Sequence, residues 1–314
     1  MKATWQGIKA ELVSVIDGSA NGSDCAATFI RHNETIRRCR AWPKYAQGNY
    51  MTEFTAIAPE SHAQKAWKNV TDYGFSSENA IIQLVGAELS DAALAMPTGF
   101  IVHEAGYQLV AITSLQSGQN LYVAPDGKWL GTYIPSALRA YPFRLLKHES
   151  AEKPVLCINE ASGLVVEGVE EGNDFFDDEN QPTQGIKDIL NFLTEVEASR
   201  VATQRAVNVL ADAGLITSWV INLKQGEKDV PVEGLFRIDE AALNKLDDED
   251  FLAVRGAGGL VLAYAQLFSM KQLVILERLG RLQGQIFQQQ TAQSEAANLN
   301  GFSLSADEGS LIFD

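Results

Sequence analysis

A short aromatic segment holds the side chains of this chain that are best suited to bind a ligand. Five of them lie between positions 126 and 143: Trp129, Tyr133, Arg139, Tyr141 and Phe143. Aromatic rings line many sugar and peptide sites, and Arg139 is the only polar anchor near these rings. The rings serve either architecture, which is the favoured interpretation, or an aromatic ligand-binding surface.

The backbone expected to carry the first two rings is a β-strand over residues 128–134. Alternation along such a strand would place Trp129 and Tyr133 on one face, with Leu130 and Ile134 on the other. One of these faces must pack in the core. The strand therefore leaves one face for a ligand and assigns the other to packing.

An acidic segment is the only candidate for a metal site. Seven carboxylates fall within thirteen residues: Glu167, Glu170, Glu171, Asp174, Asp177, Asp178 and Glu179. Calcium takes roughly six to eight oxygen ligands, but the spacing and central glycine of an EF-hand are lacking. A solvated loop that leads into a helix is the favoured interpretation. A weak Ca²⁺ site at Asp174, Asp177, Asp178 and Glu179 is the alternative, and no other cofactor is expected.

The sequence contains no recognisable catalytic constellation. Its histidines, at positions 32, 62, 103 and 148, are far apart and lack metal-ligand spacing. No G-x-S-x-G elbow, Walker loop or CxxC pair is present. His148 and Glu149 are adjacent, a pairing that occurs by chance in many chains. We therefore expect no catalysis, the alternative being an enzyme that combines the aromatic surface with His148, Glu149 or Arg139.

The last residues of the chain have the character of a docking segment. Leu311, Ile312, Phe313 and Asp314 are mostly apolar, and acidic residues precede them. The segment before them, from Gly284, is rich in Gln, Ala, Ser and Asn, a composition typical of flexible chains. Short apolar ends of this kind enter a partner's groove or add a strand to a sheet. We expect the tail to bind a protein partner or the chain itself.

Net charge and hydropathy exclude some partners. The chain has 314 residues and a formal net charge of −15, which argues against nucleic-acid and anionic-membrane surfaces. The best candidate span, Gly256 to Met270, has fifteen uncharged residues, fewer than the roughly 18–20 that a bilayer needs. We therefore predict a buried helix there and no membrane span. No secretory signal is visible, so the expected location is cytoplasmic, with signal-independent export as the alternative.

Charge also divides the chain. Residues 1–50 hold seven basic and four acidic side chains, so their net charge is +3, whereas the remainder carries −18. Met51 follows this break. We expect an N-terminal extension over 1–50, either an over-extended gene start or a basic arm. An α+β domain over 51–283 and a flexible tail over 284–314 complete the predicted organisation.

Periodicity predicts an α+β fold that is β-rich first and helical later. Glycine-containing turns suggest an antiparallel meander, followed by one more strand. The expected strands are Ile81–Val85, Phe100–His103, Tyr107–Leu115, Asn120–Ala124, Lys128–Ile134 and Val155–Asn159. A short helix near Ala92 and a long one over 183–214 are predicted. A hairpin over 219–238, a helix capped by Asp239 and a long helix from Asp247 to about Arg281 follow.

Several blocks in this order resemble the bacterial SapC family. The blocks are Asp126 to Phe143, Phe176 to Thr183, Gly234 to Asn244 with Phe251-Leu252 and, more weakly, Val85 to Pro97. Together they extend over about residues 52–283. The sequence departs from the family pattern at Asn180, where a glycine is usual, and at Thr98-Gly99, where an aliphatic residue is usual.

The resemblance implies an architecture and a setting rather than a reaction. Family members are described as surface-layer or envelope-related, and the family has no catalytic residues to carry over. We therefore expect a non-catalytic binding or accessory protein linked to envelope or nutrient-uptake systems. The alternatives are an enzyme acting on a small molecule, sugar or peptide at the aromatic site, and a structural subunit of a surface layer.

Overall fold

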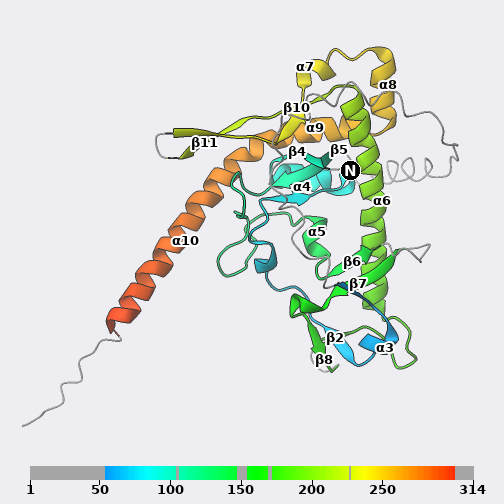
Figure 1. The fold of residues 1–314 in the computed structure, drawn as a ribbon, viewed down its shortest axis with the longest axis vertical. Helices are drawn as coiled ribbons and strands as arrows, with labels where there is room; N and C mark the ends of the chain where they lie inside the picture. Colours follow the sequence, from blue (N-terminus) through cyan, green and yellow to red (C-terminus); the bar gives the residue numbers. More distant parts are fainter. Residues whose placement is uncertain (1–53, 104–105, 147–153, 169–171, 226–227, 301–314) are drawn as a thin grey trace, which may run out of the picture. The chain divides into compact units, whose positions relative to one another are not determined.

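The fold belongs to the mixed α+β class that the sequence predicts. A computed structural model describes residues 54–103, 106–146, 154–168, 172–225 and 228–300. Antiparallel sheets dominate the first half of this part of the chain, and the long helices follow (Figure 1). The expectations for residues 1–50 and for Leu311, Ile312, Phe313 and Asp314 concern residues outside the described ranges.

The strands form several separate antiparallel sheets. A five-stranded sheet has the order β10-β13-β4-β5-β3, and two three-stranded sheets have the orders β1-β7-β6 and β8-β2-β9. Strands β11 and β12 pair as a hairpin. The bounds are β1 Phe54–Ala56, β2 Lys65–Trp67, β3 Ile81–Gln83, β4 Thr98–His103, β5 Gly106–Ile112, β6 Phe143–Leu146, β7 Val155–Asn159, β8 Val165–Glu167, β9 Asn173–Asp174, β10 Ile216–Ser218, β11 Ile221–Gln225, β12 Lys228–Val232 and β13 Phe236–Ile238.

Helices connect and cover these sheets. The α-helices are α3 Pro59–His62, α4 Leu89–Ala95, α5 Ser136–Arg139, α6 Gln184–Asp212, α7 Glu240–Leu243, α8 Asp248–Gly256, α9 Gly259–Ser269 and α10 Leu273–Asn300. Short 3₁₀ turns are η2 Gly74–Ser76, η3 Gly86–Glu88, η4 Glu160–Ser162 and η5 Met270–Gln272. Asp239 caps α7 as predicted, because its Oδ1 accepts hydrogen bonds from the amides of Ala241 and Ala242.

Two apolar clusters form the core, and the long helix α6 contributes to both. The larger cluster packs the five-stranded sheet with α4, α9 and the second half of α6, where Val207 and Leu210 are buried. The smaller one joins β6 and β7 to the first half of α6 through Phe143, Phe175 and Ile186. Its 29 residues give α6 a length of about 44 Å, so one rigid element spans both clusters.

The predicted meander is only half correct. Strands β4 and β5 pair as expected, but the segments 120–124 and 128–134 are not strands and share a single β-bridge between Val123 and Trp129. The reason is local packing. The indole Nε1 of Trp129 donates to the carbonyl of Tyr133 at 2.8 Å, which curls the chain, and a Cβ on Gly131 would lie 2.7 Å from the Tyr122 ring. The two-faced alternation expected for residues 128–134 therefore does not apply.

The helical end of the chain also differs from expectation. The helix predicted from Asp247 to Arg281 is interrupted at Gly258, whose φ of +77° suits glycine. Helix α10 then continues to Asn300, so residues 284–300 are helical where a flexible segment was expected. Within the described residues, the helical run Gly259–Ala292 is long and apolar enough to cross a membrane by length and composition alone. A core helix passes the same test, and α9 packs on α4 and β13.

Candidate functional site

A cavity of about 270 Å³ lies beside the smaller apolar cluster. Three segments far apart in the sequence line it: Trp67 to Val70 with Tyr73, Leu138 to Tyr141 with Phe143, and Ile189 with Phe192 of α6. This volume is just below the roughly 300–1,000 Å³ typical of small-molecule sites. The cavity therefore suits a small ligand.

Aromatic contacts hold the apolar side of the cavity. Phe143 opens β6, is buried, and meets the Trp67 ring edge to face at 5.0 Å between centroids. Tyr141 stacks on Phe75 at 3.9 Å with an interplanar angle of 10°. The Trp67 Nε1–H is shielded from solvent and has no hydrogen-bond partner among the described residues, so it does not face the open cavity. These rings offer a ligand apolar faces in fixed positions.

Arg139, the last residue of α5, supplies a cation to this aromatic setting. Its guanidinium carbon lies 5.7 Å from the centroid of the Tyr133 ring and 5.2 Å from that of Phe192. Its Nη2 donates a hydrogen bond to the Tyr133 hydroxyl at 3.3 Å. The side chain is exposed, and within the described ranges no carboxylate forms an ion pair with it.

A buried carboxylate supports Arg139 through Tyr133. Glu88 is 5% exposed and accepts four hydrogen bonds: from the Val85 amide at 2.9 Å, the Ser136 amide at 2.7 Å, the Ser136 hydroxyl at 2.9 Å and the Tyr133 hydroxyl at 2.7 Å. Burial, and then the bond to Glu88, raises the pKa of Tyr133. Tyr133 therefore keeps its proton, donates it to Glu88, and offers its oxygen to Arg139.

The structure places four of the five aromatic-segment residues in or next to the cavity and the fifth, Trp129, elsewhere. Arg139, Tyr141 and Phe143 line the cavity, and Tyr133 contacts Arg139 without lining the cavity itself. Trp129 does not take part, because it stacks on Tyr122 at 5.2 Å and packs against the larger cluster.

Sequence reasoning did not find Trp67, Lys68, Phe192 or Glu88 as parts of this site. The first three come from β2, the loop after it and α6, and no local pattern links these elements to the aromatic segment. The position of Glu88 could have been recognised from the sequence, because a glutamate three residues after the start of a helical turn can accept a hydrogen bond from the amide at that start, here the amide of Val85.

The acidic residues proposed for calcium form a turn. The Asp177 Oδ1 accepts hydrogen bonds from the amides of Glu179 and Gln181 at 3.0 and 2.8 Å, and Asp174 lies in β9. Asp178 and Glu179 are exposed. No three acidic, histidine or cysteine side chains in the described part of the chain are grouped as a metal site requires. Calcium binding therefore stays a prediction from composition.

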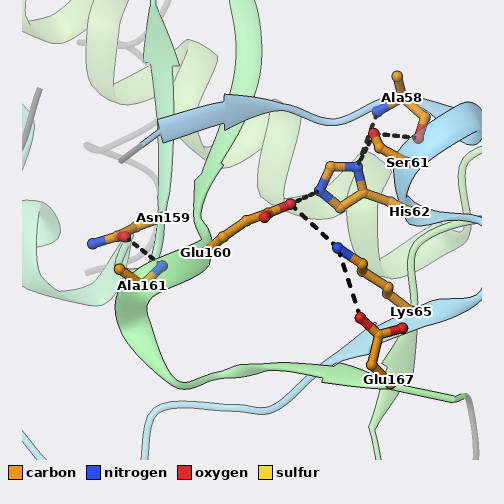
Figure 2. A network of polar contacts seen from close by, with 8 residues as sticks. All are labelled: Ala58, Ser61, His62, Lys65, Asn159, Glu160, Ala161 and Glu167. Carbon is orange, nitrogen blue, oxygen red and sulfur yellow. Dashed lines mark hydrogen bonds and ion pairs between the residues drawn. The ribbon is translucent and has the colours of Figure 1, made fainter. Parts of the chain in front are cut away.

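A second polar cluster surrounds the buried His62 of α3 (Figure 2). Its Nδ1 lies 2.7 Å from the Ser61 Oγ, and its Nε2 lies 3.2 Å from Oε1 of Glu160, a contact that is ionic only when His62 is protonated. Lys65 reaches the same Glu160 oxygen at 3.5 Å. Burial lowers the pKa of His62, although a backbone hydrogen bond with Ala58 and the Glu160 carboxylate oppose the shift.

The order hydroxyl, imidazole, carboxylate is that of a nucleophile with its base. Ser61, His62 and Glu160 nevertheless do not line the cavity, and the Ser61 hydroxyl also lies 3.3 Å from the carbonyl of Ala58. We assign this cluster to structure, because it ties α3 to η4. The pair His148 and Glu149, named above as catalytic alternatives, is outside the described ranges.

Comparison with known proteins agrees with the resemblance noted in the sequence. The family model described as SapC matches residues 57–276, which is more than half of the chain. Neither a curated protein nor a solved structure gives a significant match. The match contains every residue that lines the cavity, together with Glu88 and Tyr133.

Proposed function

Since this chain belongs to the SapC family, we propose that it is a non-catalytic binding or accessory protein of that family, and that a small organic molecule occupies the cavity beside Arg139. One observation carries the proposal. The described residues that line the cavity are mostly aromatic or aliphatic, and their polar groups are the side chains of Lys68, Asn69 and Arg139 and the hydroxyls of Tyr73 and Tyr141. Apolar walls with a few convergent polar groups are typical of ligand sites.

The same lining argues for binding rather than catalysis. General acid–base work at neutral pH mostly uses histidine or a carboxylate, and covalent work uses an activated serine, threonine, cysteine or lysine. The described lining residues include one lysine, Lys68, but no histidine, carboxylate, cysteine, serine or threonine that could act as its general base or as another nucleophile. An enzyme would have to bring a histidine or carboxylate base to the cavity from elsewhere, and no contact described above favours that alternative.

The cellular setting is part of the proposal and rests on the family resemblance alone. We propose a role in the cell envelope or in nutrient uptake for this ligand-binding accessory protein. The tail Leu311 to Asp314 is its proposed contact with a protein partner. A pull-down that compares the full chain with one truncated after Asn300 tests this contact. Equal recovery of every partner by both chains would exclude it.

Blocking the cavity tests the binding proposal. We would screen a library of small fragments by ligand-observed NMR against the wild-type chain and against Ala140→Phe, which places a ring in the cavity lining. Ala137→Phe is the matched control, because Ala137 is exposed on α5, the short helix whose C-cap is Ala140, and does not line the cavity. We expect a set of fragments that bind wild type and Ala137→Phe but not Ala140→Phe. A screen without such fragments would refute the proposal.

A further inference from the structure

We infer that the ligand is an aromatic carboxylate whose anionic group pairs with Arg139 while its ring lies against the aromatic side of the cavity. This inference rests on the proposed function and narrows it to one chemical class. Three independent features of the site carry it: local charge, the geometry of Arg139 and the kind of side chains that face the ligand.

Local charge at the cavity is opposite to that of the whole chain. The chain carries a formal net charge of −15, yet Arg139 lies at the cavity without an ion-pair partner among the described residues, and the described lining residues include no acid. A concave region with one sign of charge concentrates ligands of the opposite sign. A cation would meet repulsion here, whereas an anion would meet attraction.

The guanidinium of Arg139 is positioned to pair with a planar anion. Rings of Tyr133 and Phe192 lie near the guanidinium carbon, and one nitrogen donates to the Tyr133 hydroxyl. A guanidinium has five N–H donors in a planar fork, so several remain after this bond. A carboxylate matches that fork with two parallel hydrogen bonds.

The rest of the lining selects a flat apolar body over a sugar. Trp67, Tyr141, Phe143 and Phe192 contribute rings, and Ile189 contributes an aliphatic surface. A sugar ring needs several hydrogen-bonding partners for its hydroxyls. Asn69 is the single side-chain amide, and no carboxylate lies among the described lining residues. An aromatic ring needs no such partners and gains from offset or edge contacts with the aromatic side chains.

Tyr133 and Glu88 act as positioning residues in this scheme. Glu88 holds the Tyr133 hydroxyl at 2.7 Å, and Tyr133 in turn accepts the bond from Arg139. Neither Glu88 nor Tyr133 lines the cavity. Loss of the Tyr133 hydroxyl should therefore loosen the guanidinium and weaken anion binding without changing the apolar contacts of the ligand.

The test is calorimetric titration with a matched pair of probes, 2-naphthoate and its neutral analogue 2-naphthamide. We expect naphthoate to bind wild type roughly tenfold more tightly than naphthamide, and the preference to shrink at high salt. Arg139→Gln should weaken naphthoate by roughly tenfold and leave naphthamide unchanged. Tyr133→Phe should weaken naphthoate by about threefold, again without effect on the amide. Ala140→Phe should abolish both.

The outcomes separate this inference from the proposal on which it rests. Equal affinity for acid and amide, both lost in Ala140→Phe, would overturn the carboxylate inference and leave the binding function intact. Naphthoate binding that survives Ala140→Phe would place the anion elsewhere and also overturn the inference. If neither probe binds while other fragments still depend on Ala140, the ligand class is wrong. Absence of any Ala140-dependent fragment removes the function itself.

Discussion

The buried carboxylate of Glu88 gives the sharpest prediction about stability. It is 5% exposed and no cation contacts it among the described residues, so its charge is balanced by four hydrogen-bond donors. Oε1 accepts from the Val85 amide and the Ser136 hydroxyl, while Oε2 accepts from the Ser136 amide and the Tyr133 hydroxyl. Each oxygen thus faces one backbone N–H, which cannot reverse its role, and one hydroxyl, which can rotate.

The substitution Glu88→Gln preserves the shape of the side chain but replaces one acceptor oxygen with an NH₂ donor. It therefore tests whether both carboxylate oxygens are needed as acceptors for the two backbone N–H groups. Whichever way the amide turns, its NH₂ group faces a backbone N–H, of Val85 or of Ser136, and leaves that donor unsatisfied. Hydrogen bonds to a charged group contribute roughly 1.5–3 kcal/mol, and an orphaned buried donor costs roughly 1–3 kcal/mol. We therefore expect Glu88→Gln to lower the free energy of unfolding by about 3 kcal/mol. Ser136→Ala, which removes only one hydroxyl bond, should lower it by about 1 kcal/mol.

Denaturant unfolding followed by circular dichroism measures these differences. Glu78→Gln is the matched control, because Glu78 is exposed and should change the free energy of unfolding by less than about 0.5 kcal/mol. A Glu88→Gln protein whose free energy of unfolding lies within about 0.5 kcal/mol of wild type, the range expected of a neutral surface substitution, would refute the reasoning. It would mean that water or a local shift satisfies the facing N–H groups.

Three further predictions concern other positions. Asn180 has a φ of +56°, so Asn180→Gly should be neutral or slightly stabilising, whereas Asn180→Val should cost about 1–2 kcal/mol in denaturant unfolding. Gly131→Ala should destabilise by about 1–3 kcal/mol, because its Cβ would meet the Tyr122 ring at 2.7 Å, while Gly280→Ala, in an open position of α10, should stabilise by about 0.5–1 kcal/mol. A Gly131→Ala protein as stable as wild type would contradict the close packing. Burial lowers the pKa of His62 below its ordinary value of 6.5, so the unfolded chain binds more protons and stability is lost as the pH falls below 6.5 through the folded pKa. His62→Asn should flatten this loss between roughly pH 7 and 5 in thermal unfolding, and an unchanged pH profile would contradict it.

Hydrophobic periodicity and capping residues predicted the elements whose structure depends mainly on residues close together in the sequence. The 3.6-residue period over 183–214 predicted α6, and the Asp239 side chain predicted the start of α7. The segment from Asn120 to Ile134 was predicted wrongly because ring packing between Tyr122 and Trp129 decides its path. The polar composition after Gly284 suggested flexibility, yet its Gln and Ala residues are good helix formers that extend α10.

The candidate site was less predictable because its residues meet only in the folded chain. Arg139, Tyr141 and Phe143 were recognised as a possible ligand surface from their types alone. Trp67 lies 72 residues before Arg139 and Phe192 lies 53 residues after it, and no periodicity connects the three segments. Asn180 itself has a left-handed backbone with a φ of +56°, a conformation that asparagine and glycine adopt more readily than other residues.

The sequence suggested either an architectural role or a ligand-binding role for the aromatic segment. One face of α6 shows how the two roles are compatible. Phe192, Ser199 and Thr203 are spaced by seven and four residues, so they share a face of the helix. Phe192 lines the cavity beside Arg139, while Ser199 and Thr203 accept hydrogen bonds from the amides of η3, the turn that contains Glu88. The helix therefore holds both an apolar side chain of the cavity lining and the turn whose carboxylate supports Arg139. Within the aromatic segment, Tyr133 belongs to this support and Arg139, Tyr141 and Phe143 line the cavity, so under the proposed function the same eighteen residues serve both purposes.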